Sequence, residues 1–456
     1  MTGKLPMCRS RSIGPAKTKS PRPHKRRLNP DIPTHRRKSH VPVHARTPSP
    51  DTKALLDGWL AANGPVALHL RQKLLPVEAD ESGRGVIFPP TYADIGYSVD
   101  KLADGTCVAM IDTVGSQANR LEPIFKSAGK DAAGNELNAL ASLVPQVEII
   151  LHNAGGKKVN KKQEGEEEHI EKRSLLDLAH RSADAVVLAC PTLAPAIAKA
   201  FEALRNQGNA TPLAVIAPTS LVFGVWDSRG TSGVKLPRLV RSIIRAWDVE
   251  VLHSAAQFNS VWKALSEEQR QELEKEAKAK KIKLSVKGFA DAPATFRTDK
   301  NQFINGAPNP DARVLGGVLV KGNIERDVTI NLVALRGIRG EDDAETLELQ
   351  QYLLGLALLA ATADIELFLR EGCLLRYANA SQWMVVPRSG EPTEVHLPAQ
   401  DELFAYTKAA AKPFKAKWPD GLKKDDKPVL EHKFDLAEAK KLLTKKDDNA
   451  LAEAQS

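Results

Sequence analysis

The spacing of apolar and polar residues predicts a chain in which helices alternate with strands. Two apolar runs of strand length, at 106–113 and 146–151, are each followed by a polar segment. Residues 193–208 have helical periodicity and end at a glycine, which favours a helix C-cap. Residues 343–364 predict a longer and largely apolar helix. We therefore predict an α+β fold.

Other segments extend this prediction. Residues 314–340 predict a β-hairpin or strand pair with its turn at 321–323. Residues 266–281 begin with Ser266 and Gln269 at capping-box spacing and predict a highly charged, exposed helix. Further elements are predicted over four segments, which are strands at 212–226, 365–377 and 381–387 and a helix at 175–189.

Composition divides the chain into three regions. Residues 1–50 contain nine prolines, 13 Lys and Arg, one acid and no aromatic residue, so we expect a disordered basic tail. Residues 51–398 are expected to fold as one domain, which carries a polar loop insertion at 152–174 and a charged helical arm at 263–283. Residues 399–456 are expected to form a Lys-rich C-terminal extension.

The charge of the chain is unevenly distributed. The net charge is +9, but the first 50 residues contribute +12, which leaves −3 for the remainder. If the folded part binds nucleic acid, it must therefore do so through local basic surfaces and not through its overall field.

Cysteine spacing and hydropathy exclude several classes of protein. The four cysteines form no CxxC pair, so neither a zinc knuckle nor a disulfide framework is predicted, and a reducing cytoplasm is the expected compartment. The longest apolar run, 353–363, is shorter than the roughly 18 residues of a membrane span. No apolar segment near the N-terminus predicts a signal peptide.

The stretch WDSRGTSGVKLPRLVRSIIRAWD, residues 226–248, has charge of one sign between its two aspartates. With Pro237 in a first turn, residues 238–247 predict a helix. Its three arginines would then share one face, opposite an apolar face. Together with the hydroxyls and glycines before them, they favour a phosphate-binding surface over a solvated or acid-paired face. The candidate residues are Arg229, Thr231, Ser232, Lys235, Arg238, Arg241 and Arg245.

A second polar stretch, DTVGSQANRLEP at 112–123, follows the predicted strand at 106–113. Such a strand-to-helix junction commonly presents donors to a ligand. The alternative is a capped helix that holds a neighbouring loop, and the residues alone do not decide between the two. The candidates are Ser116, Gln117, Asn119 and Arg120.

Four blocks, at 111–122, 220–258, 322–337 and 352–375, occur in an order that resembles a known family. This family is the CRISPR-associated RAMP-superfamily backbone subunit of the type I-U (I-G) Cascade effector complex, and the resemblance covers roughly 89–387. It implies an RRM-like, ferredoxin-like palm with inserted finger and thumb elements. It also implies RNA contact by the two sets of candidate residues.

The same resemblance implies a set of partners. The chain is expected to bind crRNA without catalysing a reaction, to oligomerise along the guide, and to present it for pairing with target DNA. Other Cascade subunits, including a large subunit and an RNA-processing subunit, are expected partners, as is a recruited helicase-nuclease. No membrane, cofactor or metal is expected.

Two other functions remain open. A metal-dependent RNase would use Asp112 or Asp227, each of which adjoins a polar or basic block. A scaffold protein would use the basic face to dock an acidic protein. His180 and His253 lack a carboxylate and a nucleophile at motif spacing, and the chain has no GxxxxGK[ST], GxSxG or HExxH motif.

Overall fold

The computed structural model describes the parts of the chain that carry most of the predicted elements. These are residues 47–92, 95–132, 134, 136–152, 170–227, 233–253, 265–279, 303–304, 307–308, 315–419 and 430–442. Most of the predicted tail at 1–50, most of the loop at 152–174, and the candidates Arg229, Thr231 and Ser232 lie outside the described residues.

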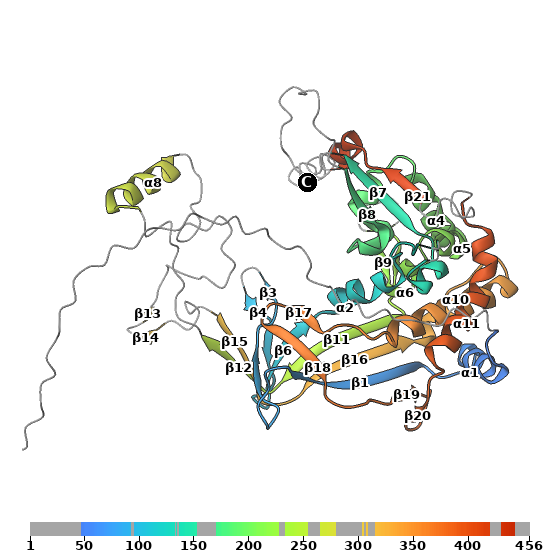
Figure 1. The fold of residues 1–456 in the computed structure, drawn as a ribbon, viewed down its shortest axis with the longest axis horizontal. Helices are drawn as coiled ribbons and strands as arrows, with labels where there is room; N and C mark the ends of the chain where they lie inside the picture. Colours follow the sequence, from blue (N-terminus) through green and yellow to red (C-terminus); the bar gives the residue numbers. More distant parts are fainter. Residues whose placement is uncertain are drawn as a thin grey trace, which may run out of the picture. The chain divides into compact units, whose positions relative to one another are not determined.

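A large antiparallel sheet organises the described residues (Figure 1). Its strands run in the order β17-β18-β1-β16-β11-β6-β5, while β19 pairs with the first half of β1 and with β20. The bounds are β1 Ala67–Pro76, β5 Val99–Lys101, β6 Cys107–Asp112, β11 Val240–Trp247, β16 Ile324–Asn331, β17 Phe368–Arg370, β18 Cys373–Tyr377, β19 Trp383–Val386 and β20 Thr393–Val395. The predicted α+β class is confirmed.

The two faces of this sheet differ in polarity because side chains alternate along each strand. Leu68, Leu70 and Leu74 of β1 are buried on the inner face, where Val328 and Ile330 of β16 join them. The residues between them, on the outer face, are mostly charged or polar and at least partly exposed. The hydrophobic core therefore lies on one side of the sheet.

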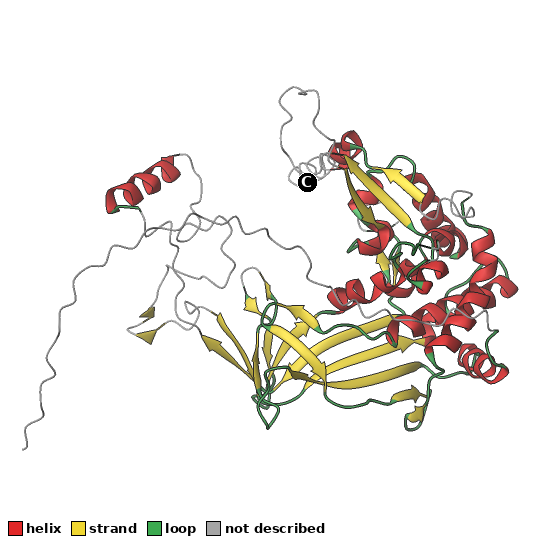
Figure 2. Ribbon diagram, viewed as in Figure 1, coloured by secondary structure: helices red, strands yellow, loops and turns green. Residues whose placement is uncertain are grey.

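Helices cover the core side. They include α1 Pro50–Leu60, α10 Asp343–Ala361 and α11 Gln400–Ala416, which contact one another, and α10 also contacts β11 and β16. Figure 2 shows α10 and α11 in red beside the yellow strands. Tyr352 of α10 stacks on Phe414 of α11 with ring centroids 5.2 Å apart. The predicted C-terminal extension thus contributes α11 to the core.

A long ribbon of two strands extends beyond the large sheet. After β11 the chain continues into β12 Val249–His253, which pairs with β15 Leu315–Val320, and β15 leads into β16. The predicted hairpin at 314–340 is wrong, because β15 pairs with β12 and with β2 Gly85–Ile87 and not with β16. Residues 321–323 instead form a bend opposite Asp248, whose φ is 50°.

The segment between β12 and β15 contains α8 Glu267–Ala279 and a short pair, β13 Phe303–Ile304 and β14 Ala307–Pro308. The predicted charged helix is confirmed, and so is its capping box. The Ser266 backbone N–H donates to Gln269 Oε1 over 2.9 Å, and the Gln269 N–H donates to Ser266 Oγ over 3.3 Å.

A smaller sheet contains β7 Val147–His152, with β8 Ile170–Ser174 antiparallel on one side and β21 Leu430–Lys433 parallel on the other.

The remaining helices are α2 Val114–Leu121, η1 Glu122–Phe125, η2 Ala139–Leu143, η3 Leu175–Asp177, η4 Arg181–Ala183, α3 Ala185–Leu188, α4 Ala194–Gln207, α5 Thr211–Ile216, α6 Pro218–Phe223 and α9 Leu332–Arg336. Short strand pairs are β3 Thr91–Tyr92 with β4 Gly96–Tyr97, and β9 Val225–Trp226 with β10 Lys235–Leu236. No helix in the described ranges is both long and apolar enough to cross a bilayer.

Three further secondary-structure predictions are wrong. Residues 238–247 form β11 and its approach, not a helix, because alternate residues, including Ser242, are buried on the core face. Residues 212–226 are mainly α5 and α6, each with a proline in its first turn, which favours helix initiation. Residues 175–189 form only the short helices η3, η4 and α3.

The contact between α10 and α11 requires a residue without a side chain. A Cβ added to Gly355 would lie 2.9 Å from Thr407 Cβ and 3.0 Å from Thr407 Cγ2, and the Thr407 side chain is held by a hydrogen bond to the Leu403 carbonyl. We predict that Gly355→Ala lowers the free energy of unfolding by about 1–2 kcal/mol, because overpacking exceeds the gain in helix propensity. Urea denaturation measures the change.

The matched control is Gly58→Ala in α1, where an added Cβ would meet no atom within 4 Å. This substitution should raise the free energy of unfolding by up to about 1 kcal/mol, since only helix propensity changes. Equal effects of the two substitutions would contradict the close contact at Gly355.

Candidate nucleic-acid interface

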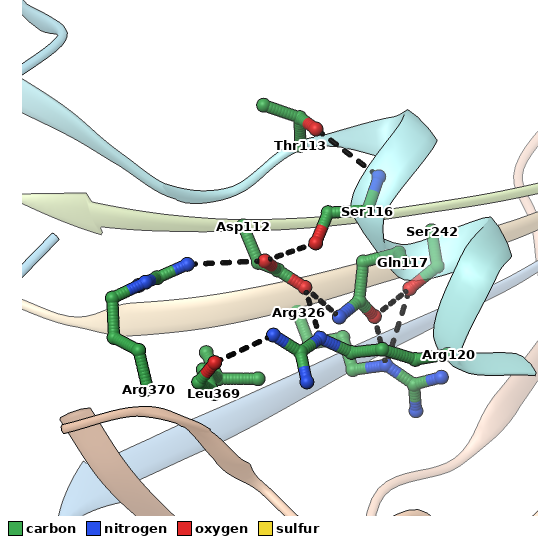
Figure 3. A network of polar contacts seen from close by, with 9 residues as sticks. All are labelled: Asp112, Thr113, Ser116, Gln117, Arg120, Ser242, Arg326, Leu369 and Arg370. Carbon is green, nitrogen blue, oxygen red and sulfur yellow. Dashed lines mark hydrogen bonds and ion pairs between the residues drawn. The ribbon is translucent and has the colours of Figure 1, made fainter. Parts of the chain in front are cut away.

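The carboxylate of Asp112 is the centre of a buried polar cluster (Figure 3). Asp112 ends β6 and is 1% exposed. It accepts hydrogen bonds from Ser116 Oγ at 2.7 Å and Gln117 Nε2 at 2.6 Å, both from α2. Arg120 Nε of the same helix donates over 3.0 Å, and Arg370 Nη2 of β17 lies 3.3 Å away. Four side chains thus share one buried acid.

The local sequence explains why α2 begins where it does. Thr113 follows the strand with extended backbone angles, and its hydroxyl accepts a hydrogen bond from the Ser116 N–H at 3.2 Å. This N-cap places Ser116, Gln117 and Arg120 over the end of β6. Arg120 also donates to the Leu369 carbonyl at 2.7 Å, which joins α2 to the β17 edge. The capped-helix alternative from the sequence matches these contacts.

A second layer joins the cluster to the middle of the sheet. Gln117 is fully buried, and its Oε1 accepts from Ser242 Oγ at 2.7 Å and from Arg326 Nε at 3.1 Å. Arg326 also donates to Gln72 Oε1 over 2.7 Å. Gln117 therefore connects α2 to the sheet and has no exposed surface. The RNA contacts expected of Ser116, Gln117, Asn119 and Arg120 stay predictions.

Arg326 is an unusual core residue, because it is 1% exposed and its hydrogen-bonding partners among the described residues are all neutral. Burial lowers the pKa of its guanidinium. The nearest acid in the network is Asp112, which is reached through Gln117. One buried carboxylate therefore has to offset three guanidinium groups, those of Arg120, Arg326 and Arg370.

A second buried pair lies at the other side of α2. Arg181 Nε is 2.6 Å from Glu122 Oε2, and both side chains are almost completely buried. Arg181 has a φ of 54°, and its guanidinium lies 5.3 Å from the Phe223 ring centroid. Its Nη2 is 3.4 Å from Asn119 Oδ1, and its Nη1 is 3.4 Å from the Gly224 carbonyl oxygen. The pair joins α2 to the start of the β9–β10 hairpin.

The basic strip lies on β11 and on the chain that leads into it. Arg241 and Arg245 occupy the outer face of β11, and Arg238 and Lys235 precede it in exposed positions. Ser242, which joins the Asp112 cluster, points to the opposite face. Arg241 and Arg245 are therefore on the face of the sheet opposite to the one that Gln117 of α2 contacts through Ser242.

Two acids of β16 lie near these arginines, but Arg71 of β1 pairs with both of them. Arg245 is opposite Glu325 in register, and Asp327 is its neighbour along β16. Arg71 of β1 donates to Asp327 Oδ1 over 2.8 Å and lies 3.9 Å from Glu325, while His69 is 3.3 Å from Asp327. Within the described ranges, Lys235, Arg238, Arg241 and Arg245 form no ion pair. Partial burial and the neighbouring Arg181 lower the pKa of Arg238.

Residues 68–251 match the family model described as CRISPR-associated protein GSU0053. This region is therefore similar to a CRISPR-associated family. The match confirms the CRISPR-associated resemblance found in the sequence, and it runs from β1 to β12. The matched region includes Asp112, α2, Arg181 and the basic strip, whereas Arg326 and Arg370 lie beyond it. A search of curated proteins found no match.

Sequence patterns missed several residues of these clusters. Arg326 and Arg370 are distant from α2 in sequence, and no local spacing relates them to Asp112. Glu122 and Arg181 are 59 residues apart in the sequence, and no local spacing relates them to each other. His180 is 75% exposed and lies 3.5 Å from Asp184, in agreement with the predicted surface histidine.

The Asp112 cluster gives a testable stability difference. We predict that Asp112→Ala lowers the free energy of unfolding by about 3–5 kcal/mol, because it leaves the partly buried guanidinium groups of Arg120 and Arg370 without their acid and the buried Gln117 amide without its acceptor. Urea denaturation measures the loss. Glu250→Ala is the control, since Glu250 pairs with Lys321 in an exposed site where water screens the salt bridge, so its loss should change stability little. Similar losses in both variants would contradict the central role of Asp112.

Glu122 predicts a specific pH dependence. Burial raises the pKa of its carboxyl to about 7, although Arg181 and Thr219 both act to lower it. Between its ordinary pKa of 4.5 and about 7, the folded chain keeps a proton that the unfolded chain has lost, so stability falls as the pH rises through this window. We expect the fall to be steeper in the wild type than in Glu122→Gln, as measured by urea denaturation across the window. Parallel curves would contradict the raised pKa.

Proposed function

We propose that the protein is a non-catalytic crRNA-binding backbone subunit of a type I CRISPR interference complex. The observation that carries this proposal is the set of cations without acid partners at Lys235, Arg238, Arg241 and Arg245. The charges of Arg241 and Arg245 are left for an external anion because Arg71 of β1 pairs with the neighbouring acids of β16, and no described acid pairs with Lys235 or Arg238. A CRISPR-associated family match over the same residues makes a guide RNA the anion that fits best.

The dimensions of the strip suit a sugar-phosphate backbone. Arg241 and Arg245 are four residues apart on one face, which corresponds to about 13 Å along a strand. They lie on a strand in the middle of the sheet, paired on both sides by β6 and β16, so their positions are well defined. Phosphate contacts of this kind hold a nucleic acid without reading its sequence. That property is required of a subunit that must accept any guide.

We also propose that the large sheet is an RRM-like palm. In support of this, β18, β1, β16 and β11 are neighbours in that order, with helices between β1 and β11 and α10 between β16 and β18. This is the strand order expected of a βαββαβ ferredoxin-like arrangement. The segment inserted between β12 and β15 would then be a finger element, and the other insertions would supply the thumb.

The hydrogen bonds of the Asp112 carboxylate support a non-catalytic role. A metal-dependent RNase would need this carboxylate free for a metal, yet two arginines, a serine and a glutamine occupy it. In the part of the chain that the structure describes, no group of three or more His, Cys, Asp or Glu residues is placed to hold a metal ion.

The proposed assembly follows from the proposed function. Copies of the chain would line up along one crRNA and present its bases to target DNA. The large subunit, the RNA-processing subunit and the helicase-nuclease of the complex would be partners, and the cytoplasm would be the site of action.

The triple variant Arg238→Glu, Arg241→Glu, Arg245→Glu tests the proposal. We expect it to fold but to lose RNA that co-purifies with the wild type, because three phosphate contacts become repulsive. For the wild type, log Kd for a single-stranded RNA should rise steeply with log salt concentration, by about 0.7 per phosphate contacted. Filter binding across a salt series measures both the affinity and the slope.

A second triple variant, Lys199→Glu, Lys412→Glu, Lys433→Glu, changes the net charge equally at exposed sites away from β11. It should keep RNA binding. Equal loss in both triple variants would show that net charge and not the strip binds RNA, and equal retention would refute the assignment. Incubation of RNA with wild-type protein and Mg²⁺ should yield no cleavage products, whereas products would support the RNase.

A further inference from the structure

Trp226 is the most exposed tryptophan among the described residues, with 60% of its surface accessible. It lies on β9, opposite Lys235 of β10, and the Lys235 ammonium is 5.3 Å from the indole centroid. Among the other tryptophans that the structure describes, Trp59, Trp383 and Trp418 are at most 8% exposed and Trp247 is partly buried. Leaving an indole in water forgoes about 25 cal/mol for each Å² of apolar surface. Trp226 is therefore available for a contact with another molecule.

The hairpin that carries Trp226 is anchored firmly at its base. The Gly224 carbonyl lies within hydrogen-bonding range of the buried Arg181, which is held by Glu122. Gly224 has a φ of 78°, and a Cβ there would lie 2.9 Å from Arg238 Cγ. The chain before β9 thus packs directly against the start of the basic strip. A rigid, exposed aromatic side chain beside cations is the usual arrangement for stacking a base of single-stranded nucleic acid.

The charges near Trp226 select the kind of partner. Lys235 and Arg238 are both exposed, and neither forms an ion pair with the described residues. They would repel a basic peptide and attract a polyanion. A polyanion that also presents flat aromatic groups is a single-stranded nucleic acid, because bases in a duplex already stack on one another.

We propose that Trp226 is a platform on which one unpaired base of the bound RNA stacks, while Lys235 and Arg238 contact the flanking phosphates. This inference rests on the proposed RNA-binding function and adds a base contact to a surface otherwise suited only to the backbone. Because an indole stacks on any base, the contact is independent of sequence. It would fix the position of the RNA along the subunit without restricting the guide.

The test compares Trp226→Ala, Trp226→Phe and wild type for binding to a single-stranded RNA and to a base-free ribose-phosphate chain of the same length. We expect Trp226→Ala to weaken RNA binding roughly 5- to 150-fold, and Trp226→Phe to retain most of the affinity, since it keeps a ring. Binding of the base-free chain should be the same in all three proteins. Phe368→Ala is the control, because Phe368 is an aromatic residue that is 54% exposed on β17, and it should bind RNA as the wild type does.

Each outcome decides the inference. Equal RNA affinity of wild type and Trp226→Ala, in a wild type that does bind RNA, overturns the platform and leaves the proposed function intact. No RNA binding by the wild type overturns both. An equal loss on RNA and on the base-free chain would mean that Trp226 only positions Lys235. If Trp226→Ala loses binding to poly-glutamate but not to RNA, the surface docks an acidic protein instead. Thermal unfolding should show that all variants fold, since Trp226 is exposed.

Discussion

The pairing of one buried carboxylate with several guanidinium groups is the constraint on which the large sheet depends. Asp112 is shut off from water, and in such surroundings an ionised group is tolerated only when hydrogen bonds and opposite charges surround it. Its partners come from α2, from β17 and, through Gln117, from β11 and β16. The interaction therefore joins elements that are up to 258 residues apart in the sequence.

Cations also outnumber acids on the outer face of the sheet. There, unlike in the buried cluster, some arginines have no acid partner among the described residues. Glu325 and Asp327 of β16 lie between β1 and β11. Arg71 of β1 pairs with both acids, and His69 lies 3.3 Å from Asp327. Arg241 and Arg245 therefore have no acid partner among the described residues, and their charges are available to solvent. The fold thus produces two kinds of arginine, those that hold elements together inside and those whose charge is available outside.

The two buried ion clusters also relate the core to the proposed RNA surface. Arg181 and Glu122 lie between α2 and the base of the β9–β10 hairpin, directly before the strip that continues into β11. A surface that grips a flexible polyanion gains affinity when its contacts are held in place beforehand, because less side-chain and backbone entropy is lost on binding. Buried charges at the hairpin base provide such rigidity, and the exposed cations and Trp226 provide the contacts.

The sequence by itself determined the fold class, the long apolar helix at α10, the capping box of α8 and the one-signed charge of the strip. These features depend on neighbours within a few turns, where composition and spacing carry the information. It did not determine that residues 240–247 are a strand. Isoleucine, valine and arginine there fit both periodicities. Ser242 hides the alternation, because its buried hydroxyl is satisfied by residues distant in sequence, Gln117 of α2 and Arg326 of β16. Which arginines become buried, and which remain free, was decided by β1, β16 and β17, because ion pairing depends on distances that only the assembled sheet establishes.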